Sequence, residues 1–272
     1  NAAASNATSY QWYSTTSATP FGNALNFDGT NDIVTTTTTL SNGDYTKEAW
    51  INIANTTGSL NIISTPTALT TSDHAFFVNA GKLMAGHNGT YTTVQDPNAL
   101  LVNKWYHVAA TYVAATKTLT LYKNGIQVAQ NIVNNMANAT SGIAIGYHNA
   151  ANFFAGSMDE VRVWNVAKSA ADILTNYNKE LVGNESGLRL YYKFNNTVAS
   201  GTNTSTVTDS KTSGTNGTAT NFALTGTSSN YIANTQDGNG IAISPNGTST
   251  SLRPSTSTAG DFYYYMIASN EA

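Results

Sequence analysis

The side chains that could take part in chemistry are few and widely spaced in this sequence. Charged residues make up 10% of the 272 residues, and the histidines are His74, His87, His107 and His148. No two of them have the close spacing of a metal-binding motif. His107 lies in a Trp-x-His strand pattern, where we expect a hydrogen-bonded sheet residue and not a catalytic base. The absence of cysteine removes thiolate nucleophiles, disulfides and cysteine-based metal sites.

The acidic residues do not have the spacing that a retaining glycosidase needs. Such enzymes hold two carboxylates about 5 Å apart. Asp159 and Glu160 are the nearest acidic pair, and successive residues of a strand point to opposite faces of a sheet. Glu48 stands alone in its predicted strand, and no Gly-x-Ser-x-Gly elbow presents a serine nucleophile. The sequence therefore predicts a protein that is not an enzyme.

Two polar segments carry the groups that carbohydrate recognition requires. An aromatic ring offers an apolar platform for a sugar, and side-chain amides hydrogen-bond to its hydroxyl groups. Both segments could instead be ordinary turns whose aromatic residues cover the core. The candidate ligand-binding residues are His87, Asn88 and Tyr91 in the first segment, and Tyr147, His148, Asn149 and Asn152 in the second.

Short antiparallel strands must position these segments. Residues 105–128 predict a three-strand meander, in which His107 and Ala109 face one side while Val108 and Ala110 face the other. Asn124-Gly125 is typical of a two-residue hairpin turn. Further strands, which together predict an antiparallel sandwich, are expected near 24–34, 45–53, 61–64, 75–79, 82–87, 142–147 and 156–164.

One short helix is predicted after the last of these strands. Ser169 is its expected N-cap, and Asp172 stands three residues later, as in a capping box. Ile173, Leu174 and Tyr177 follow on one side of the helix, and we expect the helix to lie across one edge or end of the sandwich.

Composition and charge exclude several classes of partner. The net charge is -3, the pI is about 5.7, and no Lys/Arg cluster occurs, so nucleic acid and anionic lipid are not expected as partners. No apolar run approaches the roughly 20 residues of a membrane span. A surface rich in Thr, Ser, Asn and Gly favours a secreted β protein.

Five motifs follow one another between residues 21 and 181: LNFDG, EAWI, WYHVA, LYKNG and GSMDEVRVW. In this order they resemble the laminin-G-like domains of the concanavalin A-like jelly-roll superfamily. The resemblance implies an all-β fold, an antiparallel jelly-roll sandwich. It extends to a tail, residues 187–224, like the one that follows such domains in large surface proteins of gliding bacteria.

Calcium is the cofactor that the sequence favours, because Asp carboxylates, Asn amides and backbone carbonyls suit a hard cation. By resemblance to similar jelly-roll domains, Asp159 would join Asp28, the carbonyl of Gly29, or Asn31 in a structural site. The alternative is that Asp28 and Asp32 only stabilise a turn through side-chain hydrogen bonds.

The two ends of the chain resemble parts of an immunoglobulin-like repeat. Residues 9–14 are similar to a Trp-bearing C strand, and residues 258–267 to an F strand with Tyr264 two positions before Met266. This implies that Met266 replaces a cysteine and packs against Trp12. We therefore expect a discontinuous, incomplete immunoglobulin-like β module (1–20 and 234–272) into which the jelly roll with its extension (21–233) is inserted. Loosely ordered termini are the alternative.

These resemblances imply a non-enzymatic segment of a secreted bacterial cell-surface adhesin of the gliding-motility, type IX-secreted kind. Its expected partners are a polysaccharide or glycan surface and neighbouring repeats of the same long chain, with avidity from repeated weak contacts. Two alternatives stay open. The segment could be a spacer without a ligand, or a carbohydrate-binding module of a larger enzyme.

Overall fold

The computed structural model describes residues 9–15, 22–67, 72–136, 141–149, 151–195, 199–233, 241–242 and 263–269. The side chains of 9–15, 91–93, 241–242 and 263–269 lie outside this description. Contacts divide the chain into two units, Pro20–Asn234 and the two chain ends, Asn1–Thr19 with Thr235–Ala272. No helix among the described residues is long and apolar enough to cross a membrane.

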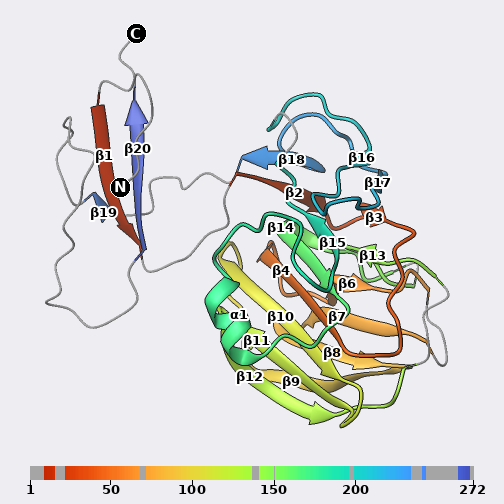
Figure 1. Ribbon diagram of the computed structural model, residues 1–272. Helices are drawn as coiled ribbons and strands as arrows, with labels where there is room; N and C mark the ends of the chain where they lie inside the picture. The colour runs from red at the N-terminus through yellow and green to blue at the C-terminus, as the bar shows by residue number, and fades with distance from the viewer. Residues whose placement is uncertain are drawn as a thin grey trace, which may run out of the picture. The chain divides into compact units, whose positions relative to one another are not determined.

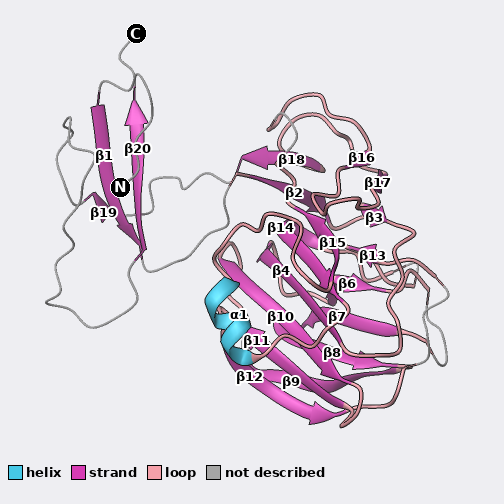
Figure 2. Cartoon of the chain, in the orientation of Figure 1, coloured by secondary structure: helices cyan, strands magenta, loops and turns pink. Residues whose placement is uncertain are grey.

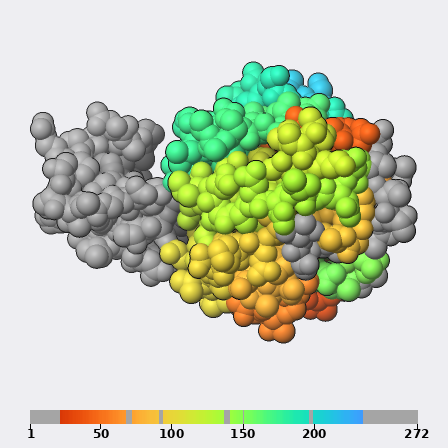
Figure 3. Space-filling view, turned by 90° about the horizontal axis from the view of Figure 1, so that it is seen from below, coloured from red at the N-terminus to blue at the C-terminus, as the bar shows by residue number. Residues whose placement is uncertain are grey.

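The largest sheet of the Pro20–Asn234 unit is antiparallel, with the strand order β12-β11-β10-β4-β14-β2-β18 and β15 also paired with β14 (Figure 1). Its strands are β2 (Asn23–Asp28), β4 (Tyr45–Ile53), β10 (Trp105–Val113), β11 (Thr118–Lys123), β12 (Ile126–Ile132), β14 (Ala155–Trp164), β15 (Leu188–Tyr192) and β18 (Asn230–Ala233). In the space-filling view, the yellow-green surface of β11 and β12 crosses the face turned to the reader (Figure 3).

Two smaller antiparallel sheets complete the sandwich, with the orders β5-β7-β8-β9 and β16-β17-β3-β13-β6 (Figure 2). Their strands are β3 (Ile33–Thr35), β5 (Ser59–Asn61), β6 (Ile63–Ser64), β7 (His74–Asn79), β8 (Lys82–His87), β9 (Thr90–Ala99), β13 (Ala144–Ile145), β16 (Thr206–Val207) and β17 (Gly217–Thr220). The sequence analysis did not predict β9, an edge strand that contains Pro97, which edge positions tolerate.

Alternation along the strands creates one core between the sheets. In β10, Tyr106, Val108, Ala110 and Tyr112 join the central hydrophobic cluster, whereas Ala109 belongs to a separate cluster on the outer face. The Asn124-Gly125 turn has the positive φ angles, 49° and 81°, that a two-residue hairpin requires. The predicted antiparallel sandwich with one short helix is thus confirmed.

The helix α1 (Ala170–Asn176) covers the outer face of the largest sheet (Figure 2). Ser169 caps it and forms the predicted capping box with Asp172. Only Ile173 of its residues is buried, against Ala109 and Tyr122. Leu174, which was expected on the same side as Ile173, is 50% exposed, because adjacent residues of a helix point about 100° apart.

The chain ends form a separate three-stranded sheet, ordered β19-β1-β20, from Ser9–Thr15 (β1), Ile241–Ala242 (β19) and Tyr263–Ser269 (β20). In the antiparallel register Trp12 stands opposite Met266. The first and last described strands of the chain therefore belong to one unit, with the sandwich inserted between them.

Candidate functional site

The described residues 146–149 and 151–153 display two aromatic rings. Tyr147 and Phe153 are half-buried and stack on each other, with ring centroids 5.5 Å apart and an interplanar angle of 30°. Asn149 and Asn152 are exposed and have positive φ angles, 56° and 57°, which asparagine tolerates. The buried Asn61 holds these residues, because its side-chain amide donates to the Tyr147 carbonyl over 2.7 Å.

Gly146 starts this loop in a conformation and a space that only glycine fits. Its φ is +77°, and a Cβ there would lie 2.3 Å from the Phe27 ring. Replacing Gly146 with alanine is expected to lower the free energy of unfolding by about 2–4 kcal/mol, from backbone strain plus overpacking. Gly89, with φ +81° and open space around it, is the matched control. A Gly89→Ala loss equal to that of Gly146→Ala in urea unfolding would contradict the packing argument.

The second predicted segment is the hairpin turn between β8 and β9. His87 pairs with Thr90, and Asn88 and Gly89 supply the positive φ angles of the turn. Tyr91 therefore lies in strand β9 and not in a loop, and its side chain lies outside the described residues.

His87 faces the core, so the structure does not place it on the surface as a ligand contact. Its ring is fully buried, and the Tyr45 hydroxyl lies 2.7 Å from Nε2. On its other side Nδ1 lies 2.8 Å from the Asn134 carbonyl, so Nδ1 donates and Nε2 accepts. Burial lowers the pKa of His87 to about 4.

Asp73 links the two loops. Its backbone N–H donates to Asn88 Oδ1 and its carbonyl accepts from the Asn88 N–H, both over 3.1 Å. Its fully buried carboxylate accepts a hydrogen bond from Thr65 and lies 3.3 Å from His148 Nε2. The structure thus brings Asn88 and the 146–153 loop together, while His148, at 6% exposure, is a support more than a surface group.

A third loop, which the sequence analysis missed, joins this end of the sandwich. The Asn135 carbonyl accepts from the Asn88 side chain over 2.6 Å, and the exposed Asn134 side chain lies 3.4 Å from Thr90 Oγ1. Adjacent asparagines after a strand were the available sequence signal. We call Asn88, Asn134, Asn135, Asn149 and Asn152 the amide rim.

Below the amide rim, the core contains a buried lysine. Lys47 is fully buried on the inner side of β4, where Nζ donates to the Ile63 carbonyl over 3.2 Å and lies 2.6 Å from His74 Nδ1. Burial lowers the pKa of Lys47 and that of His74 well below their ordinary values. This polar layer supports the rim from inside and offers no open group to a ligand.

The residues predicted to bind calcium are not brought together. Asp28 stands opposite Ala155, four residues before Asp159 on β14, which separates the two positions by about 13 Å. Asp28 Oδ1 accepts from the Thr30 N–H, and its own N–H donates to Asp32, as in a side-chain-stabilised turn. Gly29 packs on Ala155, and the Asn31 carbonyl accepts from Asn221. No group of three or more His, Asp or Glu suited to a metal occurs among the described residues, and calcium binding stays a prediction.

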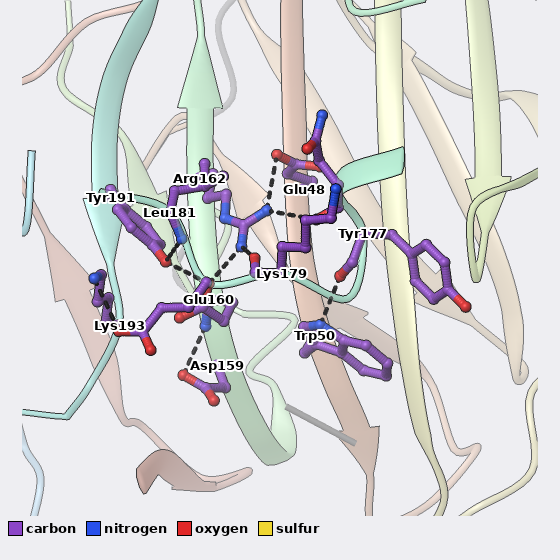
Figure 4. A network of polar contacts seen from close by, with 12 residues as sticks. Glu48, Trp50, Asp159, Glu160, Arg162, Tyr177, Lys179, Leu181, Tyr191 and Lys193 are labelled. Atoms are coloured by element: carbon purple, nitrogen blue, oxygen red, sulfur yellow. Dashed lines mark hydrogen bonds and ion pairs between the residues drawn. The ribbon is translucent and has the colours of Figure 1, made fainter. Parts of the chain in front are cut away.

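Asp159 and Glu160 share one face of the sheet, so the expectation that they point to opposite faces is wrong. The register of β14 shifts between Asp159 and Arg162, and Glu160 has a φ of +50°. This β-bulge turns Glu160 toward Arg162, on the side where Asp159 and Glu48 also lie (Figure 4). Burial, with the charge of Glu160, raises the pKa of Asp159 well above its ordinary value.

Arg162 is the centre of this outer-face network. Its guanidinium binds Glu160 and lies 3.6 Å from Glu48, while Tyr191 donates to Glu160 over 2.5 Å (Figure 4). Burial opposes ionisation of Glu48, but His107, 3.3 Å away, and Arg162 lower the pKa of its carboxyl to about 2. His107 is 1% exposed on β10, a strand in the middle of the sheet.

The segment that follows α1 closes over the network. Arg162 donates to the carbonyls of Asn176 and Lys179, and Trp50 Nε1 donates to the Tyr177 carbonyl over 3.0 Å (Figure 4). Glu48, Asp159 and Glu160 are at most 3% exposed. Arg162 and Trp50 hold the segment in place over these buried carboxylates. The amide rim, in contrast, has four exposed amides and the half-buried Asn88 at the surface, beside the stacked rings.

Comparison with known proteins places the sandwich in a family. A laminin G family model, described as the concanavalin A-like lectin/glucanases superfamily, matches residues 27–174. No curated protein matches the chain by sequence.

Several solved structures are similar to parts of this chain. A Bacteroides ovatus protein proposed to bind carbohydrate superposes with a TM-score of 0.60 at 25% identity, over 74% of this chain and 59% of that protein, so the chain spans less than two thirds of this relative. Domain 4 of AbnA, an extracellular GH43 arabinanase of Geobacillus stearothermophilus solved with arabinotriose, has a TM-score of 0.47 at 17% identity, over 57% of this chain and 76% of that chain. Domains LG4-5 of the mouse laminin alpha1 chain have a TM-score of 0.44 at 16% identity, over 53% and 41%.

Proposed function

We propose, for a chain that belongs to the concanavalin A-like lectin/glucanases superfamily, that the Pro20–Asn234 unit binds carbohydrate without catalysis. The observation that carries this proposal is the Tyr147–Phe153 stack beside the amide rim. Sugar rings stack on aromatic side chains, and their hydroxyl groups both donate and accept hydrogen bonds, as side-chain amides do. The likeness to a Bacteroides ovatus protein proposed to bind carbohydrate supports the same role.

The absence of catalysis in this proposal rests on the outer-face network. Its three carboxylates are buried, and the segment 176–181 lies across them. A retaining glycosidase needs two carboxylates that flank an accessible glycosidic bond. Here Glu48 and Glu160 both contact Arg162 instead.

We further propose that this binding serves a secreted bacterial cell-surface adhesin during attachment or gliding. In this proposal the two chain ends are part of an immunoglobulin-like stalk, with neighbouring repeats of the same long chain as further partners. The pairing of Trp12 with Met266 supports a single end unit, and the low content of charged residues supports a secreted protein. A ligand-free spacer and a module of a larger enzyme are the alternatives.

The double substitution Tyr147→Ala with Phe153→Ala tests the role of the rings. We expect it to weaken polysaccharide binding by the full chain about 30-fold, since central aromatic contacts contribute about 2 kcal/mol. Affinity electrophoresis in gels that contain single polysaccharides measures the change.

Trp105→Ala is the matched control for this test. Trp105 is also half-buried, but it starts β10, which strand β4 separates from β14, and by alternation it shares the outer face of the sheet with His107. Its loss should leave migration unchanged. Equal losses for the two variants would reject the Tyr147–Phe153 site, and no binding of any polysaccharide by the wild-type chain would favour the spacer.

A further inference from the structure

We propose that the amide rim selects polysaccharides built from uncharged sugars and rejects uronates, sulfated sugars and sialic acids. This inference rests on the proposed carbohydrate binding and adds the chemical class of the ligand. The observation that carries it is that the described loops of the rim lack the cationic side chains of an anion-binding surface.

The loops that form the rim contain almost no charge. The described segments 64–67, 72–73, 87–90, 133–136, 146–149 and 151–153 contain one Asp, Glu, Lys or Arg, which is Asp73. Asp73 is fully buried and its carboxylate is engaged by Thr65 and His148. The rim therefore presents no ammonium or guanidinium group that could pair with a carboxylate or sulfate, the contact on which recognition of such groups depends.

The charges that lie behind the rim are of both signs. The exposed Lys117 accepts a hydrogen bond at its carbonyl from the N–H of Val133, the residue before Asn134. Asp44 is exposed at the start of β4, and its carboxylate accepts from the Ala114 N–H over 2.8 Å, just past Tyr112. The Tyr112 hydroxyl in turn contacts Asn135 of the rim, over 3.5 Å. An anionic sugar on the amide rim would lose its hydration without a cationic side chain in the rim loops to pair with it, and the field of Lys117 nearby is offset by the fields of Asp44 and Asp73.

Side-chain amides favour uncharged sugars, whereas ammonium and guanidinium groups favour anionic ones. A side-chain amide carries two donor hydrogens and an acceptor oxygen, which match a neutral hydroxyl group that donates one hydrogen and accepts others. Asn134, Asn135, Asn149 and Asn152 are exposed, and Asn88 is fixed by Asp73 and Asn135. Together with the Tyr147–Phe153 stack, they offer hydrogen bonds and an apolar platform to an uncharged sugar.

Affinity electrophoresis of the full chain tests the inference with two sets of probes. The neutral set is arabinan, galactan, xylan, mannan and laminarin, and the anionic set is polygalacturonate, alginate and chondroitin sulfate. We expect retardation by at least one neutral polymer, and at least ~10-fold weaker retardation by every anionic one. Retardation by the neutral polymer should change less than about 2-fold between 50 and 500 mM NaCl, because no ion pair is screened.

The Tyr147→Ala/Phe153→Ala variant assigns each outcome to the rim. Binding of a neutral polymer that this variant loses supports the inference. Binding of an anionic polymer that is as tight or tighter, is lost in the variant and weakens with salt, overturns the inference and leaves carbohydrate binding standing. If no polymer of either set retards the wild-type chain, the proposed function itself fails.

Discussion

Replacing Arg162 with methionine is expected to lower the free energy of unfolding by about 3–5 kcal/mol, because it leaves two buried carboxylates without their cation. Glu48 and Glu160 are both 3% exposed and both contact the Arg162 guanidinium. The substitution also removes the donors that hold the carbonyls of Asn176 and Lys179. Urea unfolding, followed by tryptophan fluorescence, measures the loss.

Arg189→Met is the matched control for this prediction. Arg189 is exposed on β15, the strand next to Arg162, and its loss should change the free energy of unfolding by no more than about 0.5 kcal/mol. Adding Glu48→Gln and Glu160→Gln to Arg162→Met should restore part of the stability, since no uncompensated charge is then buried. A loss below about 1 kcal/mol for Arg162→Met would show that the network does not anchor the segment after α1.

As the pH falls from 6.5 to 4, the contribution of His87 to the free energy of unfolding is expected to decrease by about 3 kcal/mol. The native state holds the ring neutral down to its pKa of about 4, whereas an unfolded histidine takes up a proton near pH 6.5. In this window the unfolded state binds more protons, so acidification favours unfolding. Below the native pKa both states are protonated and the contribution becomes constant.

The quantity to measure is the difference in free energy of unfolding between the wild-type chain and His87→Gln, because glutamine has no group that titrates between pH 7 and pH 4. Asp32 acts in the opposite direction, because burial raises its pKa to about 6 and its native carboxyl takes up a proton first on acidification. The total pH profile therefore mixes both signs. The gap between the unfolding free energies of the two proteins should shrink or reverse by about 3 kcal/mol from pH 7 to pH 4.

Tyr45→Phe separates proton uptake from the lost hydrogen bond. It removes the donor to His87 Nε2 but leaves the imidazole in place. Its free energy of unfolding should lie below that of the wild-type chain by a similar amount at every pH. Parallel pH profiles for the wild-type chain and His87→Gln would show that the buried imidazole does not resist protonation.

Local patterns in the sequence determined the strands, the turn chemistry and the helix start. Alternation in β10 places Val108 in the core and Ala109 outside because side chains of a strand alternate with a period of two, whatever the partner strand. The Asn124-Gly125 turn and the Ser169 cap depend only on residues within four positions. The strands of the sandwich could therefore be predicted, and so could the position of the polar, aromatic connection around residues 146–153 between two of them.

The sites depended on contacts between distant segments. His87 has the sequence context of a surface turn, but its ring points inward because it is on the core side of β8, opposite Tyr45 of another sheet. Asp159 and Glu160 share a face only because a bulge interrupts β14 against β4. Neither a strand's facing direction nor a bulge is encoded by the residue type at that position.

The sequence by itself determined the candidate residues for sugar recognition, among them Asn88, Tyr147, Asn149 and Asn152, because amide and aromatic side chains suit that chemistry wherever they lie in the fold. Only the tertiary structure decided which of them lie together, and it added Asn134 and Asn135 from a loop about 45 residues away from Asn88. The tertiary structure also showed that the carboxylates of Glu48, Asp159 and Glu160 are buried under the segment after α1. The reason is that a residue's chemistry is local, whereas its neighbours and its access to water are fixed by long-range packing of the sheets.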